Sequence, residues 1–515
     1  MILKPPFPTD FDPETEISAF HDLQTRLGSV WKALTMADEE SHTSVVVPSL
    51  TLDQSELRKL AGASFYEERL LFLLMRLRNP RARVVYVTSQ PVHPMILDYY
   101  FQLLAGIPAS HARSRLTLLC AYDASPRSLT EKILERPRLI ERIRQGIQDP
   151  SRAYLTVFNS TPLERRLAVV LGIPLNGADP DLAYLGTKTG SRRVFREAGV
   201  AMPEGFEDLG NQEEIEEALV ELAGRRPGIR RAVVKLNDSF SGEGNAVFRY
   251  PEVRSRAAVR EALRRIELPV PDESFEAYMD KFCRMGGIVE EFIEGYDKVS
   301  PSAQLRINPE GEVLPISTHD QILGGPSDQV FLGCSFPARD DYRQRIQEAA
   351  LRIGEVLAAR GVVSRFAVDF LLWRNGPAEE WDMAALEINL RMGGTTHPYL
   401  ALQFLTGGKL DRGTGLFFSP TGLAKYYRAT DNLRADSYRG LLPEDLIDIL
   451  TESRLHYSYA TDSGVLFHLI GAVSEFGKLG LTAIGNSREE ADDLYYKTLE
   501  ILDREASYGR GGGGA

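Results

Sequence analysis

Short runs of β-branched and aromatic residues alternate with longer helix-like stretches in the first third of the chain. The runs lie at residues 45–47, 84–89, 116–122 and 154–158. Such an alternation predicts βαβ units, in which parallel strands form one sheet that helices cover on both faces. We therefore expect a Rossmann-like α/β domain over residues 44–180. Residues 1–43 form an N-terminal extension, in which we expect one amphipathic helix from Glu14 to Leu34.

The pattern changes after residue 180. The sequences RAVVKLNDSFSGEGNAVFRY and AQLRINPEGEVLPIS each contain two strand-like runs joined by turn-forming residues. Hairpins of this kind are typical of an α+β domain, which we expect over residues 181–408. A small C-terminal domain is expected over 409–505, with helices near 443–452 and 488–504 and strands near 464–474. Residues 506–515 are expected to be a flexible glycine-rich tail.

The composition limits the partners of the chain. There are 60 Lys and Arg residues against 72 Asp and Glu residues, a formal net charge of −12. Such a chain repels nucleic acid and anionic membranes, so we expect neither as a partner. The three cysteines, Cys120, Cys283 and Cys334, form no close pair, and the first residues lack the apolar segment of a signal peptide. We therefore expect a cytoplasmic protein.

A lysine followed by a glycine-containing loop forms the first candidate site. Lys235 ends a strand-like run, and residues 239–245 follow with small polar side chains. A lysine there can neutralise phosphate, and the loop can bring backbone N–H groups to phosphate oxygens. The dinucleotide, protein kinase and P-loop motifs all fail here, because the order of glycine, lysine, strand and helix is wrong for each. An ordinary hairpin with an exposed lysine remains an alternative.

Acidic and amide side chains on two strands form the second candidate site. Glu387 and Asn389 are two residues apart in LEINL and therefore point to one face of a strand, and Arg391 continues the alternation. Asp369 lies in the neighbouring strand-like run RFAVDF. Oxygen ligands of this kind suit Mg²⁺ together with nucleotide phosphates. A solvated polar strand face is the alternative.

These residues occur in an order that resembles a known superfamily. Lys188, Lys235 and its loop, the strand VEEFIEGYD at 289–297, Asp369, Glu387 and Asn389 follow one another as in the ATP-grasp ligases. The resemblance spans residues 180–408. Within the superfamily, the chain resembles the pheganomycin-type peptide ligases, because an α/β domain precedes the ATP-grasp region and a further region follows it.

The resemblance implies a role for each matching residue. Lys188 and Lys235 would bind the phosphates of ATP, and the loop containing Ser241, Gly242 and Gly244 would close over them. Glu290 would accept from the adenine amino group, the backbone of Glu291, Phe292 and Ile293 would bind the adenine edge, and Asp297 would bind the ribose. Asp369, Glu387 and Asn389 would carry Mg²⁺ or Mn²⁺. Arg391 would steady the transferring phosphoryl group, with Arg306 as a second arginine.

The implied function is that of an ATP-dependent carboxylate–amine ligase. ATP would phosphorylate a substrate carboxylate, and an amine would attack the acyl phosphate to form an amide, with release of ADP. The expected substrates are an amino-acid-like carboxylate and an amino acid or peptide amine, in the biosynthesis of a small natural product or peptide. Two alternatives stay open: an ATP-grasp kinase or carboxylate-activating enzyme without amine transfer, and a catalytically silent nucleotide-binding scaffold.

Overall fold

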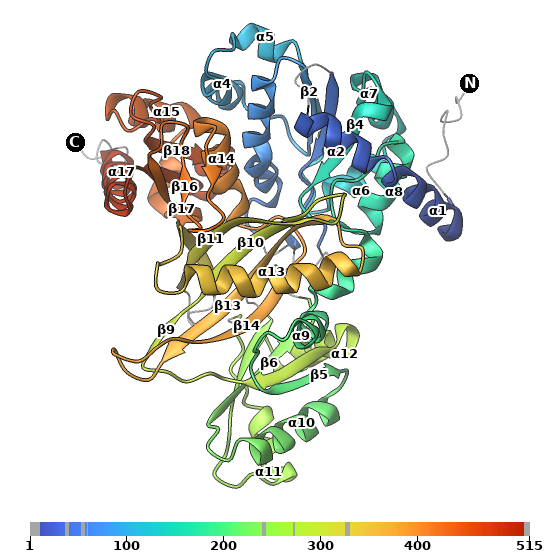
Figure 1. Ribbon diagram of the computed structural model, residues 1–515, viewed down its shortest axis with the longest axis vertical. Helices are drawn as coiled ribbons and strands as arrows, with labels where there is room; N and C mark the ends of the chain where they lie inside the picture. The colour runs from blue at the N-terminus through green and yellow to red at the C-terminus, as the bar shows by residue number, and fades with distance from the viewer. Residues whose placement is uncertain are drawn as a thin grey trace, which may run out of the picture.

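Three β-sheets organise the part of the chain that the computed structural model describes (Figure 1). The described residues are 11–36, 41–52, 57–58, 60–238, 244–270, 273–324 and 330–508. The sheets contain four, 11 and four strands. None of the helices in these residues is long and apolar enough to cross a membrane.

The N-terminal sheet is parallel, as predicted. Its strands occur in the order β3-β2-β1-β4, with the bounds β1 His42–Val47, β2 Ala82–Thr88, β3 Leu116–Cys120 and β4 Ala153–Val157. Alternate residues enter different apolar clusters: Val45 and Val85 lie in one cluster, whereas Val46 and Val84 lie in another. Both faces are therefore buried, which confirms the Rossmann-like α/β prediction.

Helices cover the two faces of this sheet. One face packs against η1 Ala63–Arg78 and α4 Pro94–Gln102. The other packs against α6 Leu129–Leu134, α7 Pro137–Gly146 and α8 Pro162–Leu171. The shorter helices are α5 Ala109–Arg113, η2 Pro150–Arg152 and η3 Pro180–Gly186. Helix α8 begins with a capping box formed by Thr161 and Glu164, so the sequence itself specifies where this helix starts.

The prediction of a single helix from Glu14 to Leu34 was wrong. The segment forms two helices, α1 Pro13–Gln24 and α2 Leu27–Met36. Helix α1 packs on α8, whereas α2 packs on β4. The side chain of Gln24 exchanges hydrogen bonds of 3.0 and 2.7 Å with the backbone of Leu175, which anchors the end of α1. One straight helix could not make both sets of contacts.

A small antiparallel sheet follows in the middle of the chain. Its order is β5-β8-β6-β7, with the bounds β5 Gly205–Leu209, β6 Arg231–Leu236, β7 Asn245–Arg249 and β8 Gly287–Glu291. One face packs against α10 Gln212–Arg225, α11 Arg256–Leu263 and α12 Phe275–Met285. Val234 and Leu236 of β6 enter this apolar cluster, so Lys235 between them points to the opposite face. Helix α9 Lys188–Glu197 precedes the sheet.

The large sheet contains the second of the two predicted hairpins, whereas β6 and β7 of the small sheet form the first. Its first part consists of β9 Asp297–Val299, β10 Pro301–Ile307, β11 Val313–Gly324, β12 Val330–Phe336, β13 Ser364–Arg374 and β14 Asp382–Asn389. The neighbouring order β14-β13-β10-β11-β12 is antiparallel. Helix α13 Arg343–Ala359 lies across this sheet and buries one of its faces (Figure 1). The predicted α+β character of this region is confirmed.

The C-terminal region continues the same sheet. Strand β12 pairs with β17 Ala424–Arg434, and β17 pairs in turn with β16 Phe417–Phe418 and β19 Lys478–Gly485. The remaining strands are β15 Lys409–Leu410 and β18 Gly464–His468. The helices are α14 Thr396–Thr406, η4 Asp436–Gly440, α15 Pro443–Glu452, η5 Ile470–Ala472, α16 Val473–Phe476 and α17 Arg488–Tyr508. The strand expected near 464–474 ends at His468, because Leu469 has a φ of 55° that no strand accommodates.

Candidate active site

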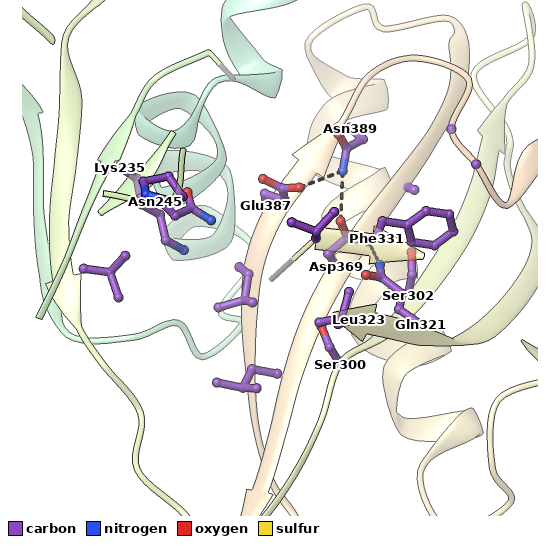
Figure 2. Close-up of a pocket in the computed structure, with 18 of the residues that line it drawn as sticks. Lys235, Asn245, Ser300, Ser302, Gln321, Leu323, Phe331, Asp369, Glu387 and Asn389 are labelled. Atoms are coloured by element: carbon purple, nitrogen blue, oxygen red, sulfur yellow. Dashed lines mark hydrogen bonds between the residues drawn. The ribbon is translucent and has the colours of Figure 1, made fainter. Parts of the chain in front are cut away.

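A cavity of about 1320 Å³ lies between the small sheet and the large sheet. In Figure 2, Lys235 and Asn245 face it from the small sheet, while Asp369, Glu387 and Asn389 face it from the large sheet. The two candidate sites that were predicted from the sequence therefore lie on opposite sides of the same cavity. Its volume exceeds that of a typical small-ligand pocket, so it has room for more than one small molecule.

The three predicted metal ligands form one hydrogen-bonded group. Asp369 on β13 is the register partner of Glu387 on β14. The Asn389 amide donates to Asp369 Oδ2 at 3.0 Å and to Glu387 Oε1 at 3.2 Å. Gln321 donates to Asp369 Oδ1 at 2.7 Å and thereby fixes this carboxylate from β11. Burial raises the pKa of Asp369. Two carboxylates and an amide converging in this way are a donor set that suits Mg²⁺.

Lys188 reaches this group from the first turn of α9. The ammonium forms an ion pair with Glu387, and only 8% of the residue is exposed. Burial is the main cause that lowers the pKa of Lys188 to about 7, and the positive charge of Lys235 is the second cause. The turn is tightly packed, because a Cβ atom at Gly190 would lie 2.0 Å from the Tyr184 carbonyl oxygen. The glycine therefore allows the approach that positions the lysine.

Lys235 is buried and paired, so it is not the exposed lysine of an ordinary hairpin. Its Nζ lies 2.5 Å from Glu290 Oε1. The other oxygen of Glu290 lies 3.3 Å from Arg192 Nη1. Glu290 thus compensates the charges of two buried cations in this structure. The predicted role of Glu290, to accept a hydrogen bond from the adenine amino group, did not include these ion pairs.

The strand predicted to hold adenine borders the cavity, and part of its backbone is already engaged. Glu291, Phe292 and Ile293 all line the cavity. The Glu291 N–H donates to the Glu204 carbonyl at 2.8 Å, and the Phe292 N–H donates to the Arg231 carbonyl at 3.1 Å. These two donors are therefore not available to a base edge in this structure, and Ile293 is the remaining backbone donor of the predicted set.

Four described residues of the predicted site are not among those that line the cavity: Lys188, Gly244, Asp297 and Arg306. Asp297 is absent from the described residues that line it and pairs instead with Arg374 at 2.7 Å. Arg306 lines a separate cavity of about 330 Å³, where it donates to Asn176 at 3.0 Å and its guanidinium lies 4.1 Å from the centre of the Trp31 ring. In this structure neither Asp297 nor Arg306 lines the large cavity.

The predicted phosphate loop is described only at its end. Ser241 and Gly242 lie outside the described residues. The carbonyl of Gly244 accepts hydrogen bonds from the Leu236 N–H at 3.1 Å and the Tyr278 hydroxyl at 3.0 Å, which close the hairpin between β6 and β7. Arg391 lines the cavity, and burial lowers its pKa.

Several residues that border the cavity were not predicted from the sequence. They lie in the N-terminal and C-terminal regions or beside the metal group: Tyr66, Arg69, Ser302, Gln321, Asp431 and Lys478. Ser302 and Gln321 could have been found from strand pairing, because Ser302 on β10 is the register partner of Asp369 and β11 is the next strand after β10 in the sheet. The other four carry no motif.

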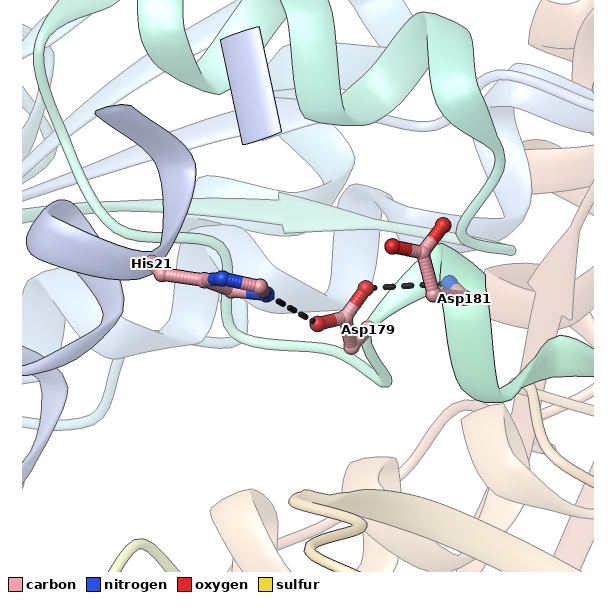
Figure 3. Close-up of side chains that lie close together, drawn as sticks. All are labelled: His21, Asp179 and Asp181. Atoms are coloured by element: carbon pink, nitrogen blue, oxygen red, sulfur yellow. Dashed lines mark hydrogen bonds and ion pairs between the residues drawn. The ribbon is translucent and has the colours of Figure 1, made fainter. Parts of the chain in front are cut away.

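A second group of possible metal ligands lies away from the cavity. His21, Asp179 and Asp181 place one ligand atom each within 4.8 Å of one another (Figure 3). However, His21 already lies 3.1 Å from Asp179, and Asp181 pairs with Arg165 at 2.7 Å. We interpret the group as an ion-pair network that ties α1 to η3.

Two family models match parts of the chain. A family model described as IQCH-like, ATP-grasp matches residues 180–270 and 253–413, and one described as PGM1 C-terminal domain matches residues 445–498. The chain is 30% identical over 467 residues to L-propargylglycine--L-glutamate ligase of Streptantibioticus cattleyicolor, covering 89% of this chain and 94% of that protein.

Two further similarities extend the comparison. The chain is 25% identical over 444 residues to IQ motif-containing protein H of Danio rerio, covering 77% of this chain but only 42% of that longer protein. Among solved structures, the biotin carboxylase domain of 2-oxoglutarate carboxylase from Hydrogenobacter thermophilus superposes with a TM-score of 0.55. That match covers 90% of each chain at 13% identity, so it bears on the fold alone.

Proposed function

We propose, since the chain belongs to the family of ATP-grasp ligases, that it joins a carboxylate to an amine at the expense of ATP. The observation that carries the proposal is that Lys235 and the Asp369–Glu387–Asn389 group line one cavity, with Lys188 paired to Glu387. Lysines neutralise phosphate charge, and the oxygen ligands suit Mg²⁺ or Mn²⁺. Phosphoryl transfer needs this positioning and charge compensation more than a covalent nucleophile.

The reaction would proceed in two chemical steps. A carboxylate oxygen of the first substrate attacks the γ-phosphorus of ATP, and ADP leaves, which produces an acyl phosphate. The amine nitrogen of the second substrate then attacks the carbonyl carbon, phosphate leaves, and the nitrogen loses a proton. Lys188, Lys235 and Arg391 would hold the phosphates in both steps. When bound, the divalent ion supplies further neutralisation of phosphate charge.

The nucleotide part of the proposal takes the structural corrections into account. Because Glu290 is occupied by Lys235 and Arg192, we place adenine next to Ile293 and Phe292 rather than on the Glu290 carboxylate. The loop with Ser241 and Gly242 remains our choice for closing over the phosphates. Ribose binding by Asp297 would require this residue to leave Arg374.

The finer parts of the proposal concern substrates and location. We infer an amino-acid-like carboxylate and an amino acid or peptide as the amine, because the relative from Streptantibioticus cattleyicolor is named for joining two amino acids. We also infer a cytoplasmic location, where ATP is available. The three free cysteines support it, since disulfides form in oxidising compartments.

The test is ADP release with pools of carboxylates and amines, followed by product mass. A ligase should release ADP in proportion to amide product and only when both pools are present. ADP that depends on the carboxylate pool alone would indicate the kinase or activating alternative, and binding without turnover would indicate the silent scaffold. Lys235→Ala should lower turnover at least ~10²-fold, as expected for the loss of one preorganised electrostatic group. The exposed Lys409→Ala is the matched control.

A further inference from the structure

A buried arginine in the cavity lacks acceptors for part of its guanidinium. Arg69 on η1 is 4% exposed, and its Nη1 donates to Asp431 Oδ2 at 3.1 Å. Its Nε and Nη2 are buried and donate to no acceptor among the residues that the structure describes. Leaving such donors unsatisfied is costly. A guanidinium in this state is ready for a second carboxylate, which two parallel hydrogen bonds would bind.

The surroundings hold this guanidinium in place. Its central carbon lies 4.4 Å from the centre of the Tyr66 ring and 4.6 Å from that of Phe158. Neighbouring Glu68 accepts from the Gly471 N–H at 2.9 Å and so joins η1 to the C-terminal region. The arginine is therefore preorganised, and a ligand would lose little free energy in ordering it.

The charges beside Arg69 match a zwitterion. Lys478 is 8% exposed, contacts the Tyr66 hydroxyl, and burial lowers its pKa to about 8. Asp431 is also 8% exposed and uses one carboxylate oxygen for Arg69. Two cations therefore face one anion, an excess that suits a ligand carboxylate, while the second oxygen of Asp431 can accept from a ligand ammonium.

This Arg69 pocket, formed by Tyr66, Arg69, Asp431 and Lys478, belongs to the same cavity as the metal group. Arg391 lines this cavity as well. None of the four residues comes from 181–408, the region that binds nucleotide in our proposal. The pocket therefore adds substrate recognition to the phosphate chemistry.

We propose that the Arg69 pocket binds the α-carboxylate and α-ammonium of an amino acid whose side-chain carboxylate is activated by ATP. Asp431 would keep the ammonium charged, because a nearby anion favours the protonated form. A protonated amine is not a nucleophile, so the amino acid held here is the acyl donor rather than the attacking amine. Its α-carboxylate is held by Arg69, so the carboxylate that reaches the metal group is the one on the side chain. The substrate class is thus an acidic α-amino acid.

This inference rests on the proposed function, and the two can fail separately. L-glutamate and L-aspartate would be offered with ATP, Mg²⁺ and a pool of amines, next to their α-carboxamide and N-acetyl derivatives. We expect ADP release with at least one free acidic amino acid. Fragmentation of the product should show the amide at the side-chain carboxylate. Blocking either α-group should raise KM at least ~10²-fold, as expected for a lost charge-assisted contact.

The variants test the pocket directly. Arg69→Gln and Asp431→Asn should raise KM for the free amino acid by a similar factor and leave KM for ATP unchanged. Arg69→Gln should add little further loss with the α-carboxamide, because the interaction is already absent. Arg439→Gln, an exposed arginine paired with Asp436, is the matched control. Should Arg69→Gln fail to fold, the α-carboxamide still tests the contact without a mutation.

Three results would overturn the inference while leaving the ligase intact. They are amide formation at the α-carboxylate, equal use of the blocked derivatives, and turnover only with carboxylates that carry no α-amino acid group. The absence of ADP release with every carboxylate and amine would instead refute the proposed function.

Discussion

Nucleotide binding should cause the protein to take up a proton near pH 8, and Lys188 should be its destination. Burial lowers the pKa of Lys188 to about 7 from an ordinary value of 10.5. At pH 8 this lysine is therefore mostly neutral in the nucleotide-free protein. Phosphates at the ammonium favour the charged form and return the pKa toward its ordinary value. The difference corresponds to uptake of ~0.9 proton at pH 8.

The same linkage fixes how affinity changes with pH. Only the protonated lysine binds phosphate well, and its fraction falls from about one half at pH 7 to about 1% at pH 9. The Kd for MgADP should therefore rise about 50-fold between these two pH values. The nucleotide itself contributes little, because a terminal phosphate has a pKa of ~6 and is largely ionised throughout.

Isothermal titration calorimetry at pH 8 in Tris and in HEPES measures the uptake, since the two buffers release protons with different enthalpies. Lys188→Gln should abolish both the uptake and the steep change of Kd, while Lys409→Gln, an exposed lysine, should leave both intact. A Kd that is equal at pH 7 and pH 9, or uptake that persists in Lys188→Gln, would refute the reasoning.

Three further outcomes are expected. Glu290→Gln should lower the free energy of unfolding in urea by about 3–5 kcal/mol, because the buried Lys235 loses its carboxylate partner and the buried Arg192 keeps only Glu207. Glu294→Gln, in an exposed pair, should cost less than ~1 kcal/mol, and equal losses would contradict the argument. Arg115→Ala should cost at least ~3 kcal/mol in the same assay, because its guanidinium satisfies four backbone carbonyls; a loss no larger than that of the exposed Arg113→Ala would contradict it. Asp369→Asn should lower ADP release at least ~10²-fold with little change in thermal unfolding, since burial already disfavours the charge; near-normal turnover would remove Asp369 from the metal group.

Local patterns explain what the sequence could predict. The alternating LEINL run places Glu387 and Asn389 on one face, and strand pairing brings Asp369 beside them. The buried β-branched runs likewise predict the parallel sheet at the N-terminus. In each case the information lies within a few residues, where the period of two of a strand determines which side chains share a face.

Position along a strand is a different matter, as Arg306 shows. It follows Ser302 by four residues on β10, which corresponds to about 13 Å of extended chain. Ser302 reaches the large cavity, whereas Arg306 has passed beyond it. Alternation alone cannot supply this distance, because it gives the face of a strand and not the location of the cavity.

The Arg69 pocket could not be predicted for another reason. Arg69 lies in η1, whereas Asp431 and Lys478 lie in β17 and β19, more than 300 residues later in the chain. An arginine among the acidic, basic and apolar residues of η1 is no motif, and its partner is determined by tertiary packing. Strand β19 is buried along its whole length, so it also lacks the alternation that identifies a half-buried strand.

The continuation of the large sheet beyond residue 408 has a practical consequence for shortened versions of this protein. A fragment that ended there would strip β12 of its neighbour β17, with which Cys334 and Phe336 are paired. The unpaired backbone groups and the apolar side chains beneath them would then form an exposed edge strand, which is prone to aggregate by pairing with strands of other chains. A fragment that ends at residue 408 should therefore be insoluble when expressed. The shortest fragment that we expect to be soluble retains β17 and β19.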